Sequence, residues 1–254
     1  MQDLSGWRVL VTGGARRLGG AMARRLARGG AAVAVHYHRS EAEARELVAE
    51  LATLSPGPHL AVPADLRSPQ AVEALLPALI GRGFRPNALV NNASVYRRQP
   101  LAAATDASVA EDYQVNFFAP FALMRAFQRL AETGCIINLL DQRVAQADPG
   151  AGVYALAKKS LRDATEAAAL EWAPAVRVNG IAPGLVLPPP GVAPDKMARL
   201  LEQVPLRRAV GVAEIAEAAA FLLASPAATG LILYLDGGLH LVPPLPEKAG
   251  APEP

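Results

Sequence analysis

Apolar runs rich in β-branched residues alternate along the chain with longer amphipathic segments rich in Ala, Leu and Arg. Apolar runs of about four to eight residues are typical of buried strands, and the longer segments have the period of helices. The pattern predicts strands over 9–11, 32–35, 59–62, 88–90, 135–138, 176–179 and 231–234. It predicts helices near 18–29, 41–54, 69–81, 108–131, 152–172 and 212–224.

Alternation of strands with helices predicts a parallel sheet, because each helix can return the chain to the edge from which the next strand starts. We therefore expect one α/β domain, a Rossmann-type, doubly wound parallel sheet of seven strands with helices on both faces. The 254 residues are enough for one such core. We place this domain at 1–242 and the proline-rich tail, 243–254, outside it.

Charge and cysteine content narrow the class of function. The formal net charge is +2, from 25 basic and 23 acidic side chains spread along the sequence, so we expect no nucleic-acid partner. Cys135 is the single cysteine and cannot form an internal disulfide, which fits a reducing cytoplasm. No run reaches the roughly 18 apolar residues that a membrane span needs. No metal is expected, since metal-ligand spacing is absent among His36, His38, His59 and His240.

Glycines join the first predicted strand to the first predicted helix, within residues 12–19. Glycine permits the unusual dihedral angles of such a turn and leaves no Cβ between the backbone and a phosphate. The helix that follows offers unpaired N–H groups and a partial positive charge to an anion. A purely structural turn is the alternative. We expect the turn to bind a dinucleotide through Gly13, Arg16, Arg17, Leu18 and Gly19.

The second predicted strand ends in a basic segment that runs His36, Tyr37, His38, Arg39 and Ser40. Folds that bind NAD place an Asp or Glu here, but the end of this strand has no carboxylate before Glu41. A carboxylate would repel the 2′-phosphate of NADP, whereas the basic segment and Arg17 would attract it. The segment therefore favours NADP(H) as cofactor, and a solvated basic strand end is the alternative.

Three motifs together resemble the short-chain dehydrogenase/reductase family. Thr12-Gly13 followed by Leu18-Gly19 resembles its Thr-Gly-x-x-x-Gly-x-Gly turn, with Arg17 in place of the middle glycine. Asn91-Asn92-Ala93-Ser94 resembles its Asn-Asn-Ala-Gly motif, with Ser94 in place of glycine. Tyr154 and Lys158, four residues apart and on one helical face, resemble its Tyr-x-x-x-Lys motif. A lysine cation there is expected to lower the pKa of the tyrosine from about 10, so that it can exchange a proton.

The resemblance implies roles for further residues. Asn116 matches the asparagine that supports the active site, and Asp65 matches an acceptor for the adenine amino group, although an isolated Asp in a turn could equally be a helix cap. A loop at about 185–205, which contains Pro188–Pro190, matches the loop that covers the substrate. The family's end motif, matched by Leu235–Gly238, implies a homotetramer formed through two helices and the last strand. The implied cofactor contacts also include Leu66, Asn92, Ala93, Ser94, Tyr154, Lys158, Pro183 and Gly184.

Asp141 lies 13 residues before Tyr154, where the family normally has a serine. A carboxyl group beside a tyrosine is expected to hold a proton and pass it on, which reduction of a C=N bond requires. Together with Arg17 and the basic segment, this exchange resembles the pteridine reductases, in which an aromatic residue at the position of Tyr96 stacks on the pterin. The implied substrate contacts are Arg17, Ser94, Tyr96, Asp141, Tyr154 and Leu185.

The sequence thus predicts an NADPH-dependent reductase of dihydrobiopterin, dihydromonapterin or dihydrofolate, with Asp141, Tyr154, Lys158 and Asn116 at the catalytic centre. One alternative is a carbonyl or 3-ketoacyl reductase that acts on a ketone, against which Asp141 argues. Another is an NADP-binding sensor without turnover, in which Tyr154 or Lys158 would be expected to be lost. The residues do not determine which pteridine is the physiological substrate.

Overall fold

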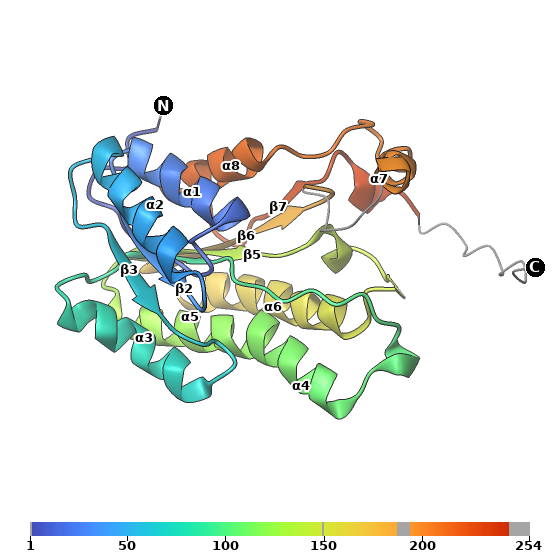
Figure 1. Cartoon of the computed structure of the whole chain (residues 1–254), viewed down its shortest axis with the longest axis horizontal. Helices are drawn as coiled ribbons and strands as arrows, with labels where there is room; N and C mark the ends of the chain where they lie inside the picture. Colours follow the sequence, from blue (N-terminus) through green and yellow to red (C-terminus); the bar gives the residue numbers. More distant parts are fainter. Residues whose placement is uncertain (1, 149, 187–193, 244–254) are drawn as a thin grey trace, which may run out of the picture.

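The strand order of the sheet reverses beside β1, so that β2 lies on one side of it and β4 on the other (Figure 1). The computed structural model describes residues 2–148, 150–186 and 194–243. Within these residues seven strands pair in parallel, in the order β3-β2-β1-β4-β5-β6-β7. The strands are β1 (Arg8–Val11), β2 (Ala32–Tyr37), β3 (Leu60–Pro63), β4 (Ala88–Asn91), β5 (Gly134–Leu139), β6 (Val176–Pro183) and β7 (Ile232–Leu235).

Helices cover both faces of this sheet, and the predicted doubly wound fold is confirmed. Helices α1, α2 and α8 lie on one face, and α3, α4, α5 and α6 lie on the other (Figure 1). The helices are α1 (Arg17–Arg28), α2 (Glu41–Leu54), α3 (Pro69–Gly81), α4 (Asp106–Tyr113), α5 (Ala119–Leu130), α6 (Gly152–Glu171), α7 (Pro194–Leu201) and α8 (Val212–Ala224). None of the helices in the described parts of the chain is long and apolar enough to cross a membrane.

The central strands are buried on both faces, which explains why they are continuous apolar runs in the sequence. In β2, Val33 and Val35 pack in the core beneath α1, α2 and α8, whereas Ala32 and Ala34 pack in the core on the α3, α5 and α6 side. All six residues of β2 and all six of β5 are buried. The sheet is therefore a rigid platform, and the loops at its carboxyl edge carry the polar groups described below.

Two segments differ from the predicted pattern. The predicted helix 108–131 is divided into α4 and α5 by a π-helical turn, Gln114–Phe118. Pro120 has no N–H to donate to the carbonyl of Asn116, and π-turns occur where the regular helix ladder is interrupted in this way. Helix α7 lies within the predicted substrate loop, where no helix was expected. Residues 187–193 of that loop and the predicted tail from residue 244 lie outside the described residues.

Candidate active site

The glycine turn between β1 and α1 leaves the N-terminus of α1 open to an anion. Arg16, the N-cap residue, makes no side-chain hydrogen bond to the first turn of α1. Gly13 has a φ of 59°. A Cβ on Gly19 would overlap the Gly13 carbonyl oxygen and lie 2.7 Å from Asn92 Nδ2. Arg16 and Arg17 are exposed beside this turn, so the backbone donors and the cations needed for a pyrophosphate are present together.

Asparagine side chains tie neighbouring strand ends together. Asn92 Nδ2 donates to the Thr12 carbonyl at 2.9 Å and to the Gly13 carbonyl at 3.1 Å. Thr12 Oγ1 accepts from the backbone N–H groups of Asn92 and Ala93, at 2.9 and 3.0 Å. In the next pair of strands, Asn91 Nδ2 donates to Asn138 Oδ1 at 2.8 Å. These bonds fix the glycine turn against the end of β4.

His36 supports this turn from inside the fold rather than adding to a cationic surface. Its Nδ1 accepts from the Gly13 N–H at 2.9 Å, so Nε2 carries the proton and donates to the Ala64 carbonyl at 3.1 Å. Burial lowers the pKa of His36 to about 4, and the imidazole is neutral at physiological pH. The prediction that the whole basic segment faces a phosphate is therefore wrong for His36, which is buried and uncharged.

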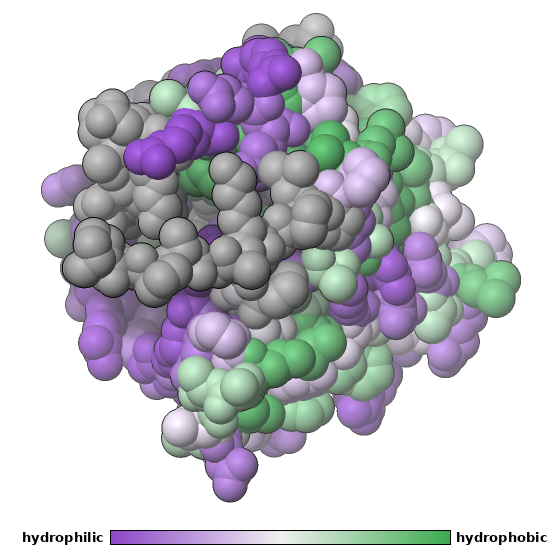
Figure 2. Space-filling view, turned by 90° about the vertical axis from the view of Figure 1, so that its right-hand side faces the viewer, coloured by the Kyte–Doolittle hydropathy of each residue, from purple (hydrophilic) through white to green (hydrophobic). Residues whose placement is uncertain are grey.

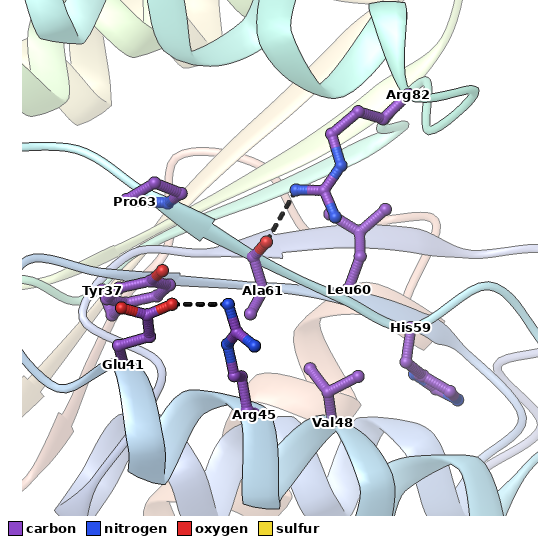
Figure 3. A pocket seen from close by; sticks show the side chains of 9 residues that line it. All are labelled: Tyr37, Glu41, Arg45, Val48, His59, Leu60, Ala61, Pro63 and Arg82. Atoms are coloured by element: carbon purple, nitrogen blue, oxygen red, sulfur yellow. Dashed lines mark hydrogen bonds and ion pairs between the residues drawn. The ribbon is translucent and has the colours of Figure 1, made fainter.

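The other residues of the basic segment lie in two different places at the edge of the sheet. His38 Nε2 lies 3.4 Å from Asp65 Oδ2, and Asp65 Oδ1 also accepts from the Arg67 N–H at 3.0 Å. Arg39 is exposed, and Ser40 is half-buried at the N-cap of α2. Tyr37 is buried and lines a groove of about 540 Å³ between α2 and β3 (Figure 3). The lining residues are Tyr37, Glu41, Arg45, Val48, His59, Leu60, Ala61, Pro63 and Arg82.

Asn116 sits in the π-turn and joins it to the loop after β4. Its Oδ1 accepts from Ser94 Oγ at 2.7 Å and from the Val95 N–H at 3.3 Å, while its Nδ2 donates to the Val95 carbonyl at 3.0 Å. The side chain is completely buried. Asn116 therefore shapes the loop that carries Ser94 and Tyr96, which fits the supporting role implied by the sequence.

Asp141 and Tyr154 meet at the carboxyl end of β5. Tyr154 Oη donates to Asp141 Oδ2 at 3.0 Å. Lys158, one turn further along α6, donates from Nζ to the Leu139 carbonyl at 2.7 Å, its one hydrogen bond to the described residues. The ring of Tyr96 meets that of Tyr154 edge-on, with centroids 4.9 Å apart. The structure thus brings together the predicted carboxyl group, phenol and amine. Asp141 accepts from Tyr154 and pairs with Arg143, so it is an ionised acceptor here and not the holder of a proton that the sequence predicts.

The charge balance of this cluster differs from the expectation for Tyr154. Burial, followed by the charge of Asp141 and its hydrogen bond, raises the pKa of Tyr154 well above its usual value. The predicted lowering by Lys158 is wrong for this arrangement, because the carboxylate is in direct contact with the phenol. Burial lowers the pKa of Lys158 to about 8. Tyr154 therefore holds its proton, as a general acid must.

Arg143 is a member of the cluster that was not predicted. Its Nη1 lies 3.1 Å from both carboxylate oxygens of Asp141, and its Nε lies 2.6 Å from Asp148 Oδ2. Its guanidinium carbon also lies 5.5 Å from the centroid of the Tyr96 ring. An arginine two residues after an aspartate is the only trace of this pair in the sequence.

The remaining predicted residues flank the site on β6 and the loops. The Gly184 N–H donates to the Leu235 carbonyl at 2.8 Å, and a Cβ on Gly184 would lie 2.6 Å from Asp236 Cβ. Leu185 accepts through its carbonyl from the Val210 N–H at 2.8 Å. Pro183 ends β6, Leu18 packs against the core, and Leu66 is buried.

No cluster of three or more His, Cys, Asp or Glu side chains placed to hold a metal ion occurs in residues 2–148, 150–186 and 194–243. The end of the molecule at which α7 lies carries hydrophilic and hydrophobic side chains mixed together, over the part that Figure 2 colours.

Comparisons with known proteins agree with this geometry. The family model described as enoyl-(acyl carrier protein) reductase matches residues 13–240. Pteridine reductase 1 of Leishmania tarentolae is 32% identical over 92% of this chain and 96% of its own length. The chain belongs to the short-chain dehydrogenase/reductase family. It is thus an oxidoreductase, and the sequence prediction is confirmed at this level.

Two further members of the short-chain dehydrogenase/reductase family help to place the chain. The crystal structure of FolM alternative dihydrofolate reductase 1 from Brucella canis, complexed with NADP, superposes with a TM-score of 0.88, is 32% identical, and covers 98% of this chain and 100% of its own. A 3-oxoacyl-[acyl-carrier-protein] reductase from Synechocystis is 31% identical over 94% of this chain and 99% of its own length. Similarity therefore extends to both pteridine and ketoacyl reductases.

Proposed function

We propose that this short-chain reductase uses NADPH to reduce a pteridine of the dihydrobiopterin, dihydromonapterin or dihydrofolate type. The observation that carries the proposal is the contact between Asp141 and Tyr154, 3.0 Å from oxygen to oxygen, at a position where the family normally has a serine. Similarity to pteridine reductase 1 and to FolM supports the same substrate class.

Cofactor binding is assigned to the glycine turn and the strand ends. The uncapped start of α1 and Arg17 would hold the phosphates, and Arg39, His38 and Ser40 would meet the 2′-phosphate. Asn92, Ala93, Ser94, Asp65, Leu66, Pro183 and Gly184 would line the nucleotide. Lys158 has a buried ammonium with donors to spare for a ribose hydroxyl. NADPH, when bound, supplies the hydride.

In the proposed reaction, the side chains of this protein bind the pterin and supply the proton. Tyr154 gives its phenolic proton to a ring nitrogen of the substrate as hydride reaches the adjacent carbon. Asp141 binds Tyr154 and faces the same substrate position, while Lys158 stabilises the phenolate that remains. Tyr96 forms an aromatic wall beside Tyr154 on which a pterin ring can stack. Arg17, Ser94 and Leu185 complete the proposed substrate contacts.

A ketone or ketoacyl substrate is the second candidate, favoured by the similarity to 3-oxoacyl reductase. A substrate panel separates the two. Purified protein and NADPH are mixed with dihydrobiopterin, dihydromonapterin, dihydrofolate or simple ketones, and loss of NADPH absorbance is followed. We expect turnover of at least one pteridine. Turnover of ketones with none of the pteridines would remove the pteridine assignment.

The Asp141→Ser variant, assayed on the same panel of substrates, tests whether the contact between Asp141 and Tyr154 matters for the reaction. Because the substitution restores the residue that the family normally has, we expect pteridine turnover to fall by at least about tenfold, or about 1.4 kcal/mol of transition-state stabilisation. Ketone turnover should not fall in parallel. Intact pteridine reduction in this variant would show that Asp141 is not the group on which the reaction depends.

The assembly proposed for this enzyme is a cytoplasmic homotetramer, with the domain over 1–242. An aromatic cluster on the α4–α5 side supports one contact face. Phe117 stacks on Phe121 with ring centroids 5.6 Å apart and meets Phe118 in a tilted geometry at 5.4 Å, and Phe118 is 50% exposed. Leu156 and Leu170 are exposed on the neighbouring α6. The partly exposed edge strand β7 supports a second face.

A further inference from the structure

Arg143 has several polar partners beside the proposed proton donor, Tyr154. Its backbone N–H donates to Asp141 Oδ1 at 2.9 Å, and its Nη1 contacts both oxygens of the same carboxylate at 3.1 Å. Nε donates to Asp148 Oδ2 at 2.6 Å. The side chain is 20% exposed, so these charges are screened less than surface pairs are.

The groups that face Tyr154 come from three elements. Asp141 and Arg143 lie at the 3₁₀ turn after β5, Lys158 lies on α6 with Tyr154, and Ser94 and Tyr96 lie on the loop after β4. Asp148 lies behind Arg143 and is the more exposed of the two carboxylates, at 29% against 16%. Asp141 thus adds one negative charge next to the phenol, and Arg143 is the cation in direct contact with that charge.

Serine in the usual family position adds no charge, so an aspartate there makes loss of the tyrosine proton harder. The contributions to the pKa of Tyr154 show this opposition: after burial, Asp141 raises the value and Arg143 lowers it. We propose that Arg143 is the positioning residue that makes an aspartate usable at position 141, by balancing its charge and by holding one carboxylate oxygen toward Tyr154. This inference rests on the proposed reduction and specifies which residue allows it.

The charges left after proton transfer show why Asp141 needs a balancing cation. When Tyr154 protonates the substrate nitrogen, its O–H bond breaks, an N–H bond forms, and hydride from NADPH completes the two-electron reduction of the C=N bond. The phenolate that remains would lie 3.0 Å from a second anion, Asp141. Arg143, which also pairs with Asp148, and Lys158 are the cations that offset this repulsion until solvent returns a proton to Tyr154.

The same guanidinium lies 5.5 Å from the centroid of the Tyr96 ring. A cation at this distance from an aromatic ring is attracted to it. Arg143 therefore connects the carboxylate that faces the proton donor to the aromatic wall proposed for the pterin. Its loss should therefore lower kcat through proton transfer and raise KM for the pteridine through placement of the substrate ring.

The test uses Arg143→Gln and Arg143→Lys, each with Asp141 present and in the Asp141→Ser background, on whichever substrate the wild type reduces. Arg143→Gln should lower kcat at pH 7.5 by at least about tenfold, as expected for an unbalanced, partly buried charge. Arg143→Lys should retain more activity than Arg143→Gln. KM for NADPH should not change.

In the Asp141→Ser background, Arg143→Gln should change kcat by less than about twofold, since no carboxylate then lies next to Tyr154. Arg162→Gln is the matched control: Arg162 Nη1 donates to the Val144 carbonyl of the same 3₁₀ turn at 2.9 Å, but is not bonded to Asp141. This control should keep wild-type kcat. If Arg143→Gln alone fails to fold, the double variant, which lacks both charges, should fold and supply the comparison.

A loss that is equally large in the Asp141→Ser background would overturn the inference, as would an equal loss in Arg162→Gln. Reduction of ketones alone by the wild type would remove the pteridine assignment and leave this test intact. Absence of any turnover would remove both. A folded Arg143→Lys variant that is as inactive as Arg143→Gln would show that the charge is not what matters.

Discussion

At the scale of single residues, His36 shows how burial turns a titratable side chain into a structural one. Both of its ring nitrogens are bonded within the fold, and its pKa is lowered from 6.5 to about 4. The folded state therefore binds a proton less readily than the unfolded state. Stability from this group is fully present above about pH 6.5 and is lost as the pH falls toward 4.

We expect His36 to remove about 3 kcal/mol from the free energy of unfolding between pH 7 and pH 4. His36→Gln should flatten this part of the dependence, since glutamine offers an acceptor and a donor but does not titrate. His59→Gln is the comparison, because the pKa of His59 is also lowered but its side chain is less buried than that of His36. Urea unfolding at a series of pH values measures the difference. Equal slopes in wild type and His36→Gln would contradict it.

Arg17 has a strained backbone, with a φ of 52°, at the position where the family normally has glycine. Left-handed geometry costs a side-chain-bearing residue about 1–2 kcal/mol, part of which glycine loses again through its more disordered unfolded state. Arg17→Gly should thus raise the free energy of unfolding by about 0.5 kcal/mol. It should also raise KM for NADPH by about tenfold, because a phosphate contact is lost.

Arg207 provides the control, since its φ is 53° and it lies on the loop after α7, far along the chain from the glycine turn. Arg207→Gly should give a similar change in stability without a change in KM for NADPH. A rise in KM in both variants, or in neither, would argue against a phosphate role for Arg17.

At the scale of elements, two neighbouring glycines of α1 have opposite environments. A Cβ on Gly19 would overlap the Gly13 carbonyl, whereas a Cβ on Gly20 would meet the end of the flexible Arg24 side chain at 3.1 Å. Gly19→Ala should destabilise the protein by about 2 kcal/mol or more and weaken NADPH binding.

Gly20→Ala should stabilise α1 by up to about 1 kcal/mol, because alanine is the better helix former. Thermal unfolding and fluorescence titration with NADPH measure both effects. If Gly19→Ala were as stable and as active as Gly20→Ala, the close packing of the glycine turn would not be a requirement for binding.

The elements also show which parts of the molecule the sequence could predict. Tyr154 and Lys158 are one helical turn apart, so their shared face follows from the spacing alone. The contacts of Arg143 depend on the path of a 3₁₀ turn, and those of His36 depend on how closely β1 and β3 approach it. Neither feature leaves a periodic pattern of apolar residues in the sequence. The π-turn at Asn116 was missed because a helical period continues almost unchanged through it.

At the scale of the whole molecule, the aromatic cluster around the exposed Phe118 on the α4–α5 side predicts an assembly. We expect a mass of four chains of 26.6 kDa in light scattering. Phe118→Glu should give dimers rather than monomers, since it places a charge in one proposed face and leaves the β7 face intact. Leu101→Glu, at an exposed leucine of another segment, should keep the wild-type mass. A monomeric wild type would remove the assembly proposal.

The groove beside β3 has a consequence for the protein at high concentration. Strand β3 is an edge of the sheet, yet the carbonyl of Ala61 is bonded by Arg82 at 2.7 Å, and Pro63 has no N–H to offer (Figure 3). A strand from another molecule would have to displace a guanidinium and would find a donor missing. These two residues therefore protect an edge that could otherwise seed aggregation, and they do so without covering it with a further element.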